Sequence, residues 1–272
     1  MSKLQLHEVT LAYGARVVLQ NISFETQQGE ILGVVGPNGC GKSTLIKAVT
    51  RVLPPSSGHI LVDGRDVTRI SPNEIAKLIA VVPQTPVLPE AFTALEVVLM
   101  GRTPHLGFLR YESQRDVSIA LHAMEMTQTS HLAERRIGEL SGGERQRLVI
   151  ARALTQEPRI VLLDEPTAHL DINYQVETLD LISSLCAQQG LTALIALHDL
   201  NLAAQYCDRI IMISDGRIYA EGLPREVITE QNVRQVYGAE VCVTPHPVNS
   251  LPATLITANG SRNLAGKRGQ GK

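Results

Sequence analysis

The stretch GEILGVVGPNGCGKST, residues 29–44, runs from an apolar segment directly into a glycine-rich loop. The loop fits the pattern G-x-x-x-x-G-K-[ST] through Gly36, Gly41, Lys42 and Ser43. The apolar spacing of residues 42–53 then predicts a helix that ends before two prolines. In a strand–loop–helix of this kind, backbone N–H groups point at phosphate oxygens. The sequence therefore predicts a phosphate-binding loop between this strand and this helix.

Each residue type in the loop has a chemical use. Glycine leaves room for the backbone to approach a phosphate. The Lys42 ammonium reaches β- and γ-phosphates, and the Ser43 hydroxyl suits a Mg²⁺ ligand. A chance match in a glycine-rich turn is the alternative, and the flanking strand and helix argue against it. The residues expected at the phosphates are Gly36, Asn38, Gly39, Cys40, Gly41, Lys42, Ser43 and Thr44.

A second apolar segment, RIVLLDEP at residues 159–166, ends in two adjacent carboxylates. Residues 160–163 are expected to form a buried strand with Asp164 at its end, where the carboxylate can hold Mg²⁺. Glu165 follows directly, and a carboxylate beside the metal ligand suits a general base that orients the attacking water. The alternative for Glu165 is a solvated acid, but the upstream phosphate loop favours the catalytic interpretation.

Two further polar residues follow short apolar strands. Gln84 ends AVVPQ, and His198 follows LTALIAL. Ligands sit at the carboxyl ends of parallel strands, so both residues are expected to face the γ-phosphate. His198 can then hydrogen-bond that phosphate or Glu165, and Gln84 can contact Mg²⁺ or the attacking water. For Gln84 the position is the only argument, and a structural role weighs equally.

The stretch ELSGGERQR, residues 139–147, contains a second candidate anion site. Ser141 is a good N-cap for the helix predicted over GERQRLVIARALTQ, and the first N–H groups of such a helix can bind phosphate. A helix that is merely capped would leave Gly142 and Gly143 without an explanation. These three residues are therefore predicted to bind nucleotide.

Composition limits the class of protein. The 272 residues are 44% hydrophobic and 19% charged with a net charge of −2, which is ordinary for a globular chain and gives no basic footprint for nucleic acid. No apolar run approaches the roughly 18 residues needed to span a bilayer, so a membrane role requires a partner. The four cysteines form no C-x-x-C pair, which argues against a zinc site or disulfide framework.

The order of predicted elements indicates an α/β fold. Antiparallel strands come first, then strands and helices alternate, which predicts a mainly parallel core sheet covered by helices. Between about residues 85 and 155 only helical patterns occur, so a helical subdomain is inserted in the sheet order. Two short helices and a strand at EVCVT follow the sheet. The basic, glycine-rich end of the chain is expected to be partly disordered.

The motifs GPNGCGKST, VVPQ, LSGGERQ, LLDEP, HLD and LHD occur in the order typical of ABC transporter ATPases, and the chain resembles that family over roughly residues 3–245. The resemblance implies a P-loop NTPase core of the RecA-like type, made of residues 1–84 and 156–222. It adds the helical subdomain of residues 85–155 and C-terminal helices and a strand at 223–245, all in one domain of residues 1–245. Residues 246–272 remain as a tail.

The resemblance also implies residue roles. Tyr13 in LAYGA corresponds to the aromatic residue that stacks on adenine, Asp171 in AHLD to the D-loop aspartate and His198 to the switch histidine. His169 departs from the usual D-loop sequence. Family geometry places Ser141 too far from its own phosphate loop, so two chains are expected to pair head-to-tail with two ATP molecules between them.

The partners implied are a second copy of the chain, integral-membrane permease subunits and, indirectly, a substrate-binding protein, with no nucleic acid. The chain would work as a peripheral protein on the cytoplasmic face of the inner membrane, with ATP and Mg²⁺. LEVVLMGRTPHLG and YGAEVCV are similar to ATPases that import ferric siderophores, haem and vitamin B12. The permease would contact residues 86–92 and 100–106, where Phe92, Leu106 and Phe108 are candidates unless they belong to the helical core.

Other functions stay open at this point. Another ABC transporter, exporting or importing a different substrate, would use the same motifs. A soluble P-loop kinase would not need Ser141, Gly142, Gly143 and His198. A chromosome-maintenance ATPase would carry a long coiled coil or a zinc insertion, and neither pattern occurs in the sequence.

Overall fold

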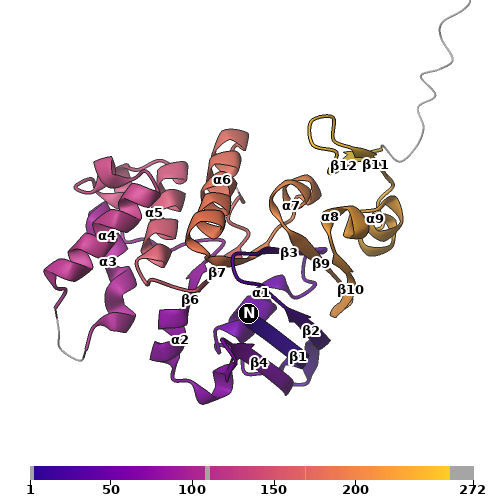
Figure 1. Ribbon diagram of the computed structural model, residues 1–272, viewed down its shortest axis with the longest axis horizontal. Helices are drawn as coiled ribbons and strands as arrows, with labels where there is room; N and C mark the ends of the chain where they lie inside the picture. Colours follow the sequence, from indigo (N-terminus) through magenta and orange to yellow (C-terminus); the bar gives the residue numbers. More distant parts are fainter. Residues whose placement is uncertain (1–2, 108–110, 169, 258–272) are drawn as a thin grey trace, which may run out of the picture.

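A six-stranded sheet forms the centre of the computed structural model, which describes residues 3–107, 111–168 and 170–257 (Figure 1). Its order is β10-β9-β3-β8-β7-β6, and all neighbours are parallel except β10, which is antiparallel to β9. The strands are β3 Ile31–Val35, β6 Ile79–Val82, β7 Ile160–Asp164, β8 Thr192–Ala196, β9 Arg209–Ser214 and β10 Arg217–Gly222.

Alternate residues of these strands belong to two different hydrophobic cores. In β3, Leu32 and Val34 face one core while Ile31 and Val35 face the other. The same alternation runs through β7 and β8, because successive side chains of a strand point to opposite faces. Both faces are therefore buried, which explains why these strands read as continuous apolar runs rather than alternating ones.

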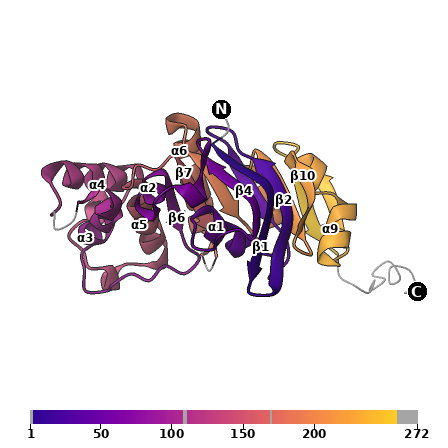
Figure 2. The same ribbon diagram turned by 90° about the horizontal axis from the view of Figure 1, so that it is seen from below.

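An antiparallel sheet covers one of these cores together with helix α1, Lys42–Val49. Its order is β2-β1-β4-β5, and Figure 2 shows β1, β2 and β4 lying across one side of the molecule. Its strands are β1 Leu4–Tyr13, β2 Arg16–Glu25, β4 Ser57–Val62 and β5 Arg65–Asp66, followed by the 3₁₀ turn η1 Val67–Arg69 and helix α2 Pro72–Leu78. A capping box begins α2, since Glu74 N–H donates to the Ser71 hydroxyl and Ser71 N–H donates to the Glu74 carboxylate.

The inserted helices lie at one end of the molecule, between β6 and β7 in the chain (Figures 1 and 2). Their apolar faces share the second core with α6 and α7, which cover the central sheet. The inserted elements are α3 Ala94–Leu99, η2 Met100–His105, α4 Gln114–Met126, η3 Ser130–Leu132, η4 Ile137–Glu139 and α5 Gly142–Leu154. Helices α6 Ile172–Gln189 and α7 Leu200–Tyr206 come later, after β7 and after β8.

A buried arginine ties this helical block together. The Arg102 guanidinium pairs with Asp116 at the start of α4, with Nε 2.9 Å from Oδ1. Its Nη1 donates to the Thr155 carbonyl and the Glu157 carboxylate just beyond α5, at 2.9 and 2.8 Å. Gly101 allows the close approach, because a Cβ there would lie 2.2 Å from the Arg152 carbonyl oxygen. One side chain therefore joins three segments of the block.

The chain ends in a small unit beside β9 and β10. It contains α8 Pro224–Val227, α9 Glu230–Tyr237 and the hairpin of β11 Val241–Pro245 with β12 Pro252–Ile256. The Asn201 side chain on α7 binds both backbone groups of Thr254 in β12, at 3.2 and 2.7 Å. Strand β11 was predicted, but β12 falls in the segment treated as a tail. Residues 258–272 of that tail lie outside the described residues.

Candidate nucleotide-binding and catalytic site

The predicted phosphate loop connects β3 to α1, at the carboxyl edge of the central sheet. Its lysine is almost fully buried, with 5% of Lys42 exposed. The Lys42 ammonium donates to the backbone carbonyls of Gly36 at 2.8 Å and Pro37 at 3.3 Å. The loop is thus folded around a cation, as a site for an anionic ligand requires.

Two loop glycines are required by close packing as well as by backbone conformation. A Cβ on Gly36 would lie 2.4 Å from the Ile213 carbonyl oxygen, and one on Gly41 would lie 2.6 Å from Leu19. Gly41 also adopts φ 112° as the residue before α1, in the left-handed region that favours glycine. Any larger residue would push the loop out of this shape. The geometry fits a phosphate cradle, in which the Cys40 N–H donates to the Pro37 carbonyl at 3.2 Å.

Ser43 and Asp164 meet beside the loop. The Ser43 hydroxyl donates to the Asp164 carboxylate at the end of β7, over 3.1 Å. Burial raises the pKa of Asp164, the Ser43 hydrogen bond opposes that shift, and the charge of Glu165 adds to it. A hydroxyl and a carboxylate are the hard oxygen ligands that Mg²⁺ takes. Two of the three residues predicted to contact Mg²⁺, Ser43 and Asp164, are therefore brought together.

Glu165 lies at the centre of the second cluster. The Gln84 amide donates to its Oε2 over 2.5 Å, and His198 Nε2 contacts its Oε1. The three residues follow β6, β7 and β8, which are neighbours in the sheet, so strand order alone places them side by side. Glu165 has φ 51° and is 8% exposed, a strained and buried position of the kind found at functional sites. Of the two partners that the sequence allowed for His198, the structure pairs it with Glu165.

The second candidate anion site is built on α5, in the helical block. Ser141 caps the helix in a capping box, with its hydroxyl 2.8 Å from the Glu144 carboxylate and accepting from Glu144 N–H. Gly142 differs, because a Cβ there would meet no atom of the described residues within 4 Å. Gly143 does have an explanation inside the chain, because its Cβ would lie 2.3 Å from the Tyr174 ring. The expectation that a capped helix alone would leave both glycines unexplained therefore holds only for Gly142.

The remaining predicted residues lie at exposed positions apart from both clusters. Tyr13 ends β1 opposite Arg16, with 46% of the residue exposed. Asp171 caps α6 by accepting a hydrogen bond from Tyr174 N–H at 3.3 Å. Among the hydrogen bonds of the described residues, none links Tyr13, Ser141 or Asp171 to the phosphate loop or to Glu165. His169, noted in the sequence, lies outside the described residues.

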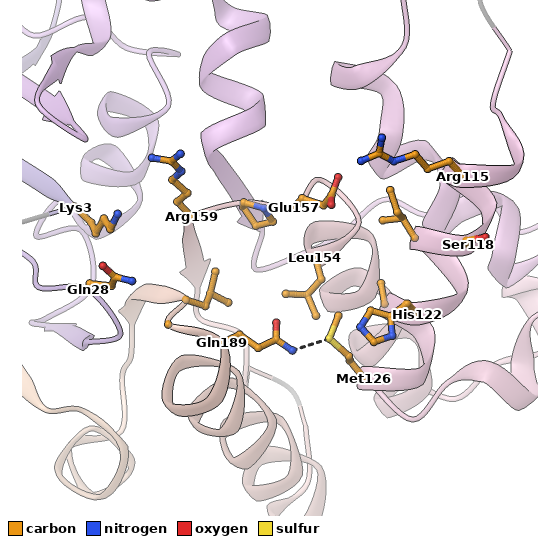
Figure 3. Close-up of a pocket in the computed structure, with 15 residues that line it drawn as sticks. Lys3, Gln28, Arg115, Ser118, His122, Met126, Leu154, Glu157, Arg159 and Gln189 are labelled. Atoms are coloured by element: carbon orange, nitrogen blue, oxygen red, sulfur yellow. Dashed lines mark hydrogen bonds between the residues drawn. The ribbon is translucent and has the colours of Figure 1, made fainter. Parts of the chain in front are cut away.

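A cavity of about 610 Å³ lies away from these clusters, at the amino ends of the strands. Figure 3 shows it between the core, which contributes Lys3 and Arg159, and α4, which contributes Arg115 and His122. The Gln189 amide approaches the Met126 sulfur across it, at 2.8 Å. None of the predicted site residues lines this cavity. It is a groove between the helical block and the core rather than the nucleotide site.

One residue beside the phosphate loop was missed from the sequence. Tyr237, at the end of α9, lies against Gly36 and Cys40. It belongs to YGAEVCV, which indicated a branch of the family but no contact. No spacing rule links a residue near the end of the chain to this loop, so only the tertiary structure reveals it. Within residues 3–107, 111–168 and 170–257, no helix has the length and apolar character to cross a membrane.

Comparison with known proteins agrees with this geometry. The sequence profile of the ABC transporter family matches residues 19–168. A petrobactin import ATP-binding protein of Bacillus anthracis is 39% identical over 259 residues, covering 95% of each chain. A hemin import ATP-binding protein of Hahella chejuensis is 42% identical over 254 residues, covering 89% of this chain and 94% of the relative.

A solved dimeric structure of a bacterial ABC transporter cassette has the same fold. It superposes with a TM-score of 0.71 at 30% identity, covering 82% of this chain and 99% of the cassette. The predicted α/β fold class, with its mainly parallel sheet, antiparallel sheet and inserted helices, is confirmed. The profile match, two relatives that span nearly the whole chain and a phosphate loop beside two carboxylates agree: this protein belongs to the ABC transporter family, as an ATP-binding ATPase subunit.

Proposed function

We propose that this ATPase powers the import of a metal chelate, of the ferric siderophore, haem or cobalamin type, through a membrane permease. The observation that carries the catalytic part is the Glu165 carboxylate, held between Gln84 and His198 beside the Ser43–Asp164 pair. The importer branch rests on relatives named for petrobactin and hemin import. The wider family assignment does not depend on that branch.

The residues of the phosphate loop would bind the phosphates of ATP. The backbone N–H groups of residues 38–44 and the Lys42 ammonium supply the positive end of the site, and exposed Tyr13 offers its ring to the adenine. Ser43 and Asp164 would hold Mg²⁺, and Gln84 is proposed as a further ligand. When bound, Mg²⁺ would neutralise the negative charge that develops on the phosphates of ATP.

Glu165 would act as the general base on the attacking water. Its two oxygens contact Gln84 and His198 in this structure, so these two side chains would compete with the attacking water for its lone pairs. His198 can turn toward the γ-phosphate and Gln84 toward the metal or the water. The site would therefore become active by an exchange of hydrogen-bond partners around one carboxylate.

A second copy of the chain would complete each site. Ser141 and Gly142 are exposed at the start of α5, where N–H groups can bind an anion, and a Cβ on Gly142 would meet none of the described residues within 4 Å. A head-to-tail pair with twofold symmetry would bring each Ser141 to the other chain's ATP, and each Asp171 to the same interface. The dimeric cassette structure is a precedent for such a pair.

The permease would dock on the loop after Gln84. Val87 and Phe92 lie there with 89% and 42% of each residue exposed, while Leu106 is half-buried and Phe108 lies outside the described residues. Exposed apolar side chains beside the base-binding glutamine suit a partner that responds to ATP. The protein would then lie peripherally on the cytoplasmic face of the membrane, and a substrate-binding protein would deliver the chelate to the permease.

Glu165→Gln tests the catalytic proposal. The amide keeps the size of the side chain but cannot accept a proton, so ATP binding should persist while hydrolysis falls by roughly 10² to 10⁴-fold. The variant should also accumulate as an ATP-bound dimer in light scattering. Glu177→Gln is the control, since that carboxylate only pairs with Arg147 on the surface. Near-normal turnover by Glu165→Gln would mean that another group is the base.

The import proposal needs the complete transporter. The chain would be purified with its permease, placed in vesicles and given binding protein loaded with a ferric siderophore, haem or cobalamin in separate arms. Uptake with stimulated ATP hydrolysis in one arm supports import of that chelate. Hydrolysis that none of the three arms stimulates contradicts the metal-chelate proposal and leaves the ATPase assignment intact.

A further inference from the structure

The hairpin of β11 and β12 is bound to α7, the helix that follows His198 (Figure 1). The Asn201 carboxamide on α7 accepts a hydrogen bond from the Thr254 N–H of β12 at 2.7 Å and donates one to the Thr254 carbonyl at 3.2 Å. Neighbouring antiparallel strands exchange the same two bonds between paired residues. The side chain of Asn201 therefore occupies the outer edge of β12 as a further strand would.

Thr254 makes this contact with its backbone and not with its side chain. The Thr254 hydroxyl is buried and has no hydrogen-bond partner among the residues that the structure describes. A buried hydroxyl without a partner lowers stability, so this side chain does not hold the residue in place. The two bonds to Asn201 and the pairing with Val243 of β11 hold it instead.

The hairpin is itself fixed to the rest of the molecule. At its other edge, the Val243 N–H donates to the Glu230 carboxylate at the start of α9, over 3.0 Å. Helix α9 buries Val236 in the core that α6 and α7 share with the central sheet. Asn201 is thus attached, through two strands and a packed helix, to a part of the chain that lies far from it in sequence.

Asn201 lies three residues after His198, and the chain between them is held on both sides. On the sheet side, the Leu197 N–H donates to the Val34 carbonyl at 3.1 Å. On the helix side, the Asp199 carboxylate caps α7 by accepting from the Asn201 N–H at 2.7 Å. The direction of the His198 side chain therefore depends on β8 before it and on the first turn of α7 after it.

We infer that Asn201 is a positioning residue for His198: its two bonds to β12 hold the first turn of α7, and with it the imidazole that contacts Glu165. The inference rests on the proposed role of His198 at the γ-phosphate. Asn201 touches neither the nucleotide nor the reacting atoms, and it acts through the start of the helix. The C-terminal hairpin thereby supports the catalytic site, from the opposite end of the sequence to the phosphate loop.

Asn201→Ala removes both bonds and leaves His198 itself unchanged. The kcat for ATP hydrolysis should fall about five- to tenfold because the imidazole is less often in its productive position, whereas the KM for ATP should stay within about twofold. Asn232→Ala is the matched control, since that asparagine donates to the Val227 carbonyl at 2.8 Å inside the C-terminal unit. Melting curves give the loss of stability in each variant, and the rates are measured below both transitions.

A double variant with His198→Ala separates positioning from a general loss of stability. When the imidazole is absent, Asn201→Ala should change the residual rate by less than about twofold, because the group that Asn201 positions is gone. Single turnovers with excess protein measure these slow rates. Thr254→Val keeps both backbone bonds and removes only the unpaired hydroxyl, so it should keep the wild-type kcat.

The outcomes are distinct. Equal kcat in Asn201→Ala and Asn232→Ala would overturn the inference. An equal fold loss from Asn201→Ala with and without His198 would also overturn it, since the effect would then not pass through the imidazole. Wild-type turnover in His198→Ala alone would instead contradict the proposed function, and that comparison involves no Asn201 variant.

Discussion

The amide of Gln84 and the carboxylate of Glu165 lie 2.5 Å apart, although 81 residues separate them in the chain. Gln84 lies two residues beyond β6, where the chain leaves the core for the helical block, and Glu165 directly follows β7 at the same edge of the sheet. The contact therefore joins the start of the block to the carboxylate proposed as the base. Movement of the block at this junction would change the distance, which would link the position of the helices to the state of the base.

Gln84→Ala should lower ATP turnover through this contact. Without the amide, Glu165 loses the donor that fixes one of its oxygens, so kcat should fall at least tenfold, roughly the worth of one hydrogen bond to a charged group. Affinity for ATP should change little. Phosphate release at saturating ATP measures the effect. Gln189→Ala is the matched control, because Gln189 contacts Met126 in the groove far from the site. Equal kcat in both variants would contradict the role.

Ser141→Arg should prevent the closed dimer and spare ATP binding by the single chain. Loss of the cap also costs about 1 kcal/mol of stability, so the variant needs a control with the same loss. Ser71→Arg supplies it, since Ser71 caps α2 in an equivalent capping box. Light scattering with ATP in a Glu165→Gln background should show dimers for Ser71→Arg only. Dimers in both variants would contradict the head-to-tail arrangement.

Gly142 and Gly143 should respond differently to substitution by alanine. Gly143→Ala forces a methyl group into the Tyr174 ring, and overpacking of this kind costs about 1–3 kcal/mol, so its melting temperature should fall. Gly142→Ala meets open space and should not destabilise the chain. Its ATPase rate should nevertheless drop if Gly142 faces a partner's nucleotide. Full activity in Gly142→Ala would remove that residue from the site.

Acid should weaken the helical block through Asp116. The Ser113 hydroxyl and N–H, and then Arg102, lower the pKa of Asp116 from 3.8 to about 2. Because the folded pKa is the lower one, this stabilisation is complete above pH 4 and is lost as pH falls toward 2. Melting curves should therefore show a smaller loss between pH 4 and pH 2 for Asp116→Asn than for wild type. Asp180→Asn, at an exposed carboxylate bonded to Tyr206, should follow the wild-type curve.

The sequence alone predicts the site residues that lie at or just beyond the end of a single strand. Asp164, Glu165, Gln84 and His198 follow apolar runs, and the carboxyl ends of parallel strands share one edge. Their mutual contacts then follow from strand order, which the sequence does not state. The contact between His198 and Glu165 could therefore only be seen in the structure.

Other features depend on contacts between distant segments. The role of Gly143 depends on Tyr174, on a different helix, and nothing in the LSGGERQ stretch encodes that ring. Strand β12 is short, and it is held by pairing with β11 and by the hydrogen bonds between Thr254 and Asn201. Because these contacts come from other segments, the local composition of β12 predicts only a tail. Tyr237 likewise acquires its meaning only from the fold.

The Tyr174 ring has a consequence for how two sites in a dimer would communicate. The ring packs under Gly143, and the backbone N–H of Tyr174 donates to the Asp171 carboxylate. Ser141 and Asp171 are thus carried on one rigid body, although they belong to different motifs. In a head-to-tail pair, neither residue can approach a nucleotide without the other. Filling one site would then prepare its twin, and the hydrolysis rate would rise with ATP along a sigmoid, with a Hill coefficient above one.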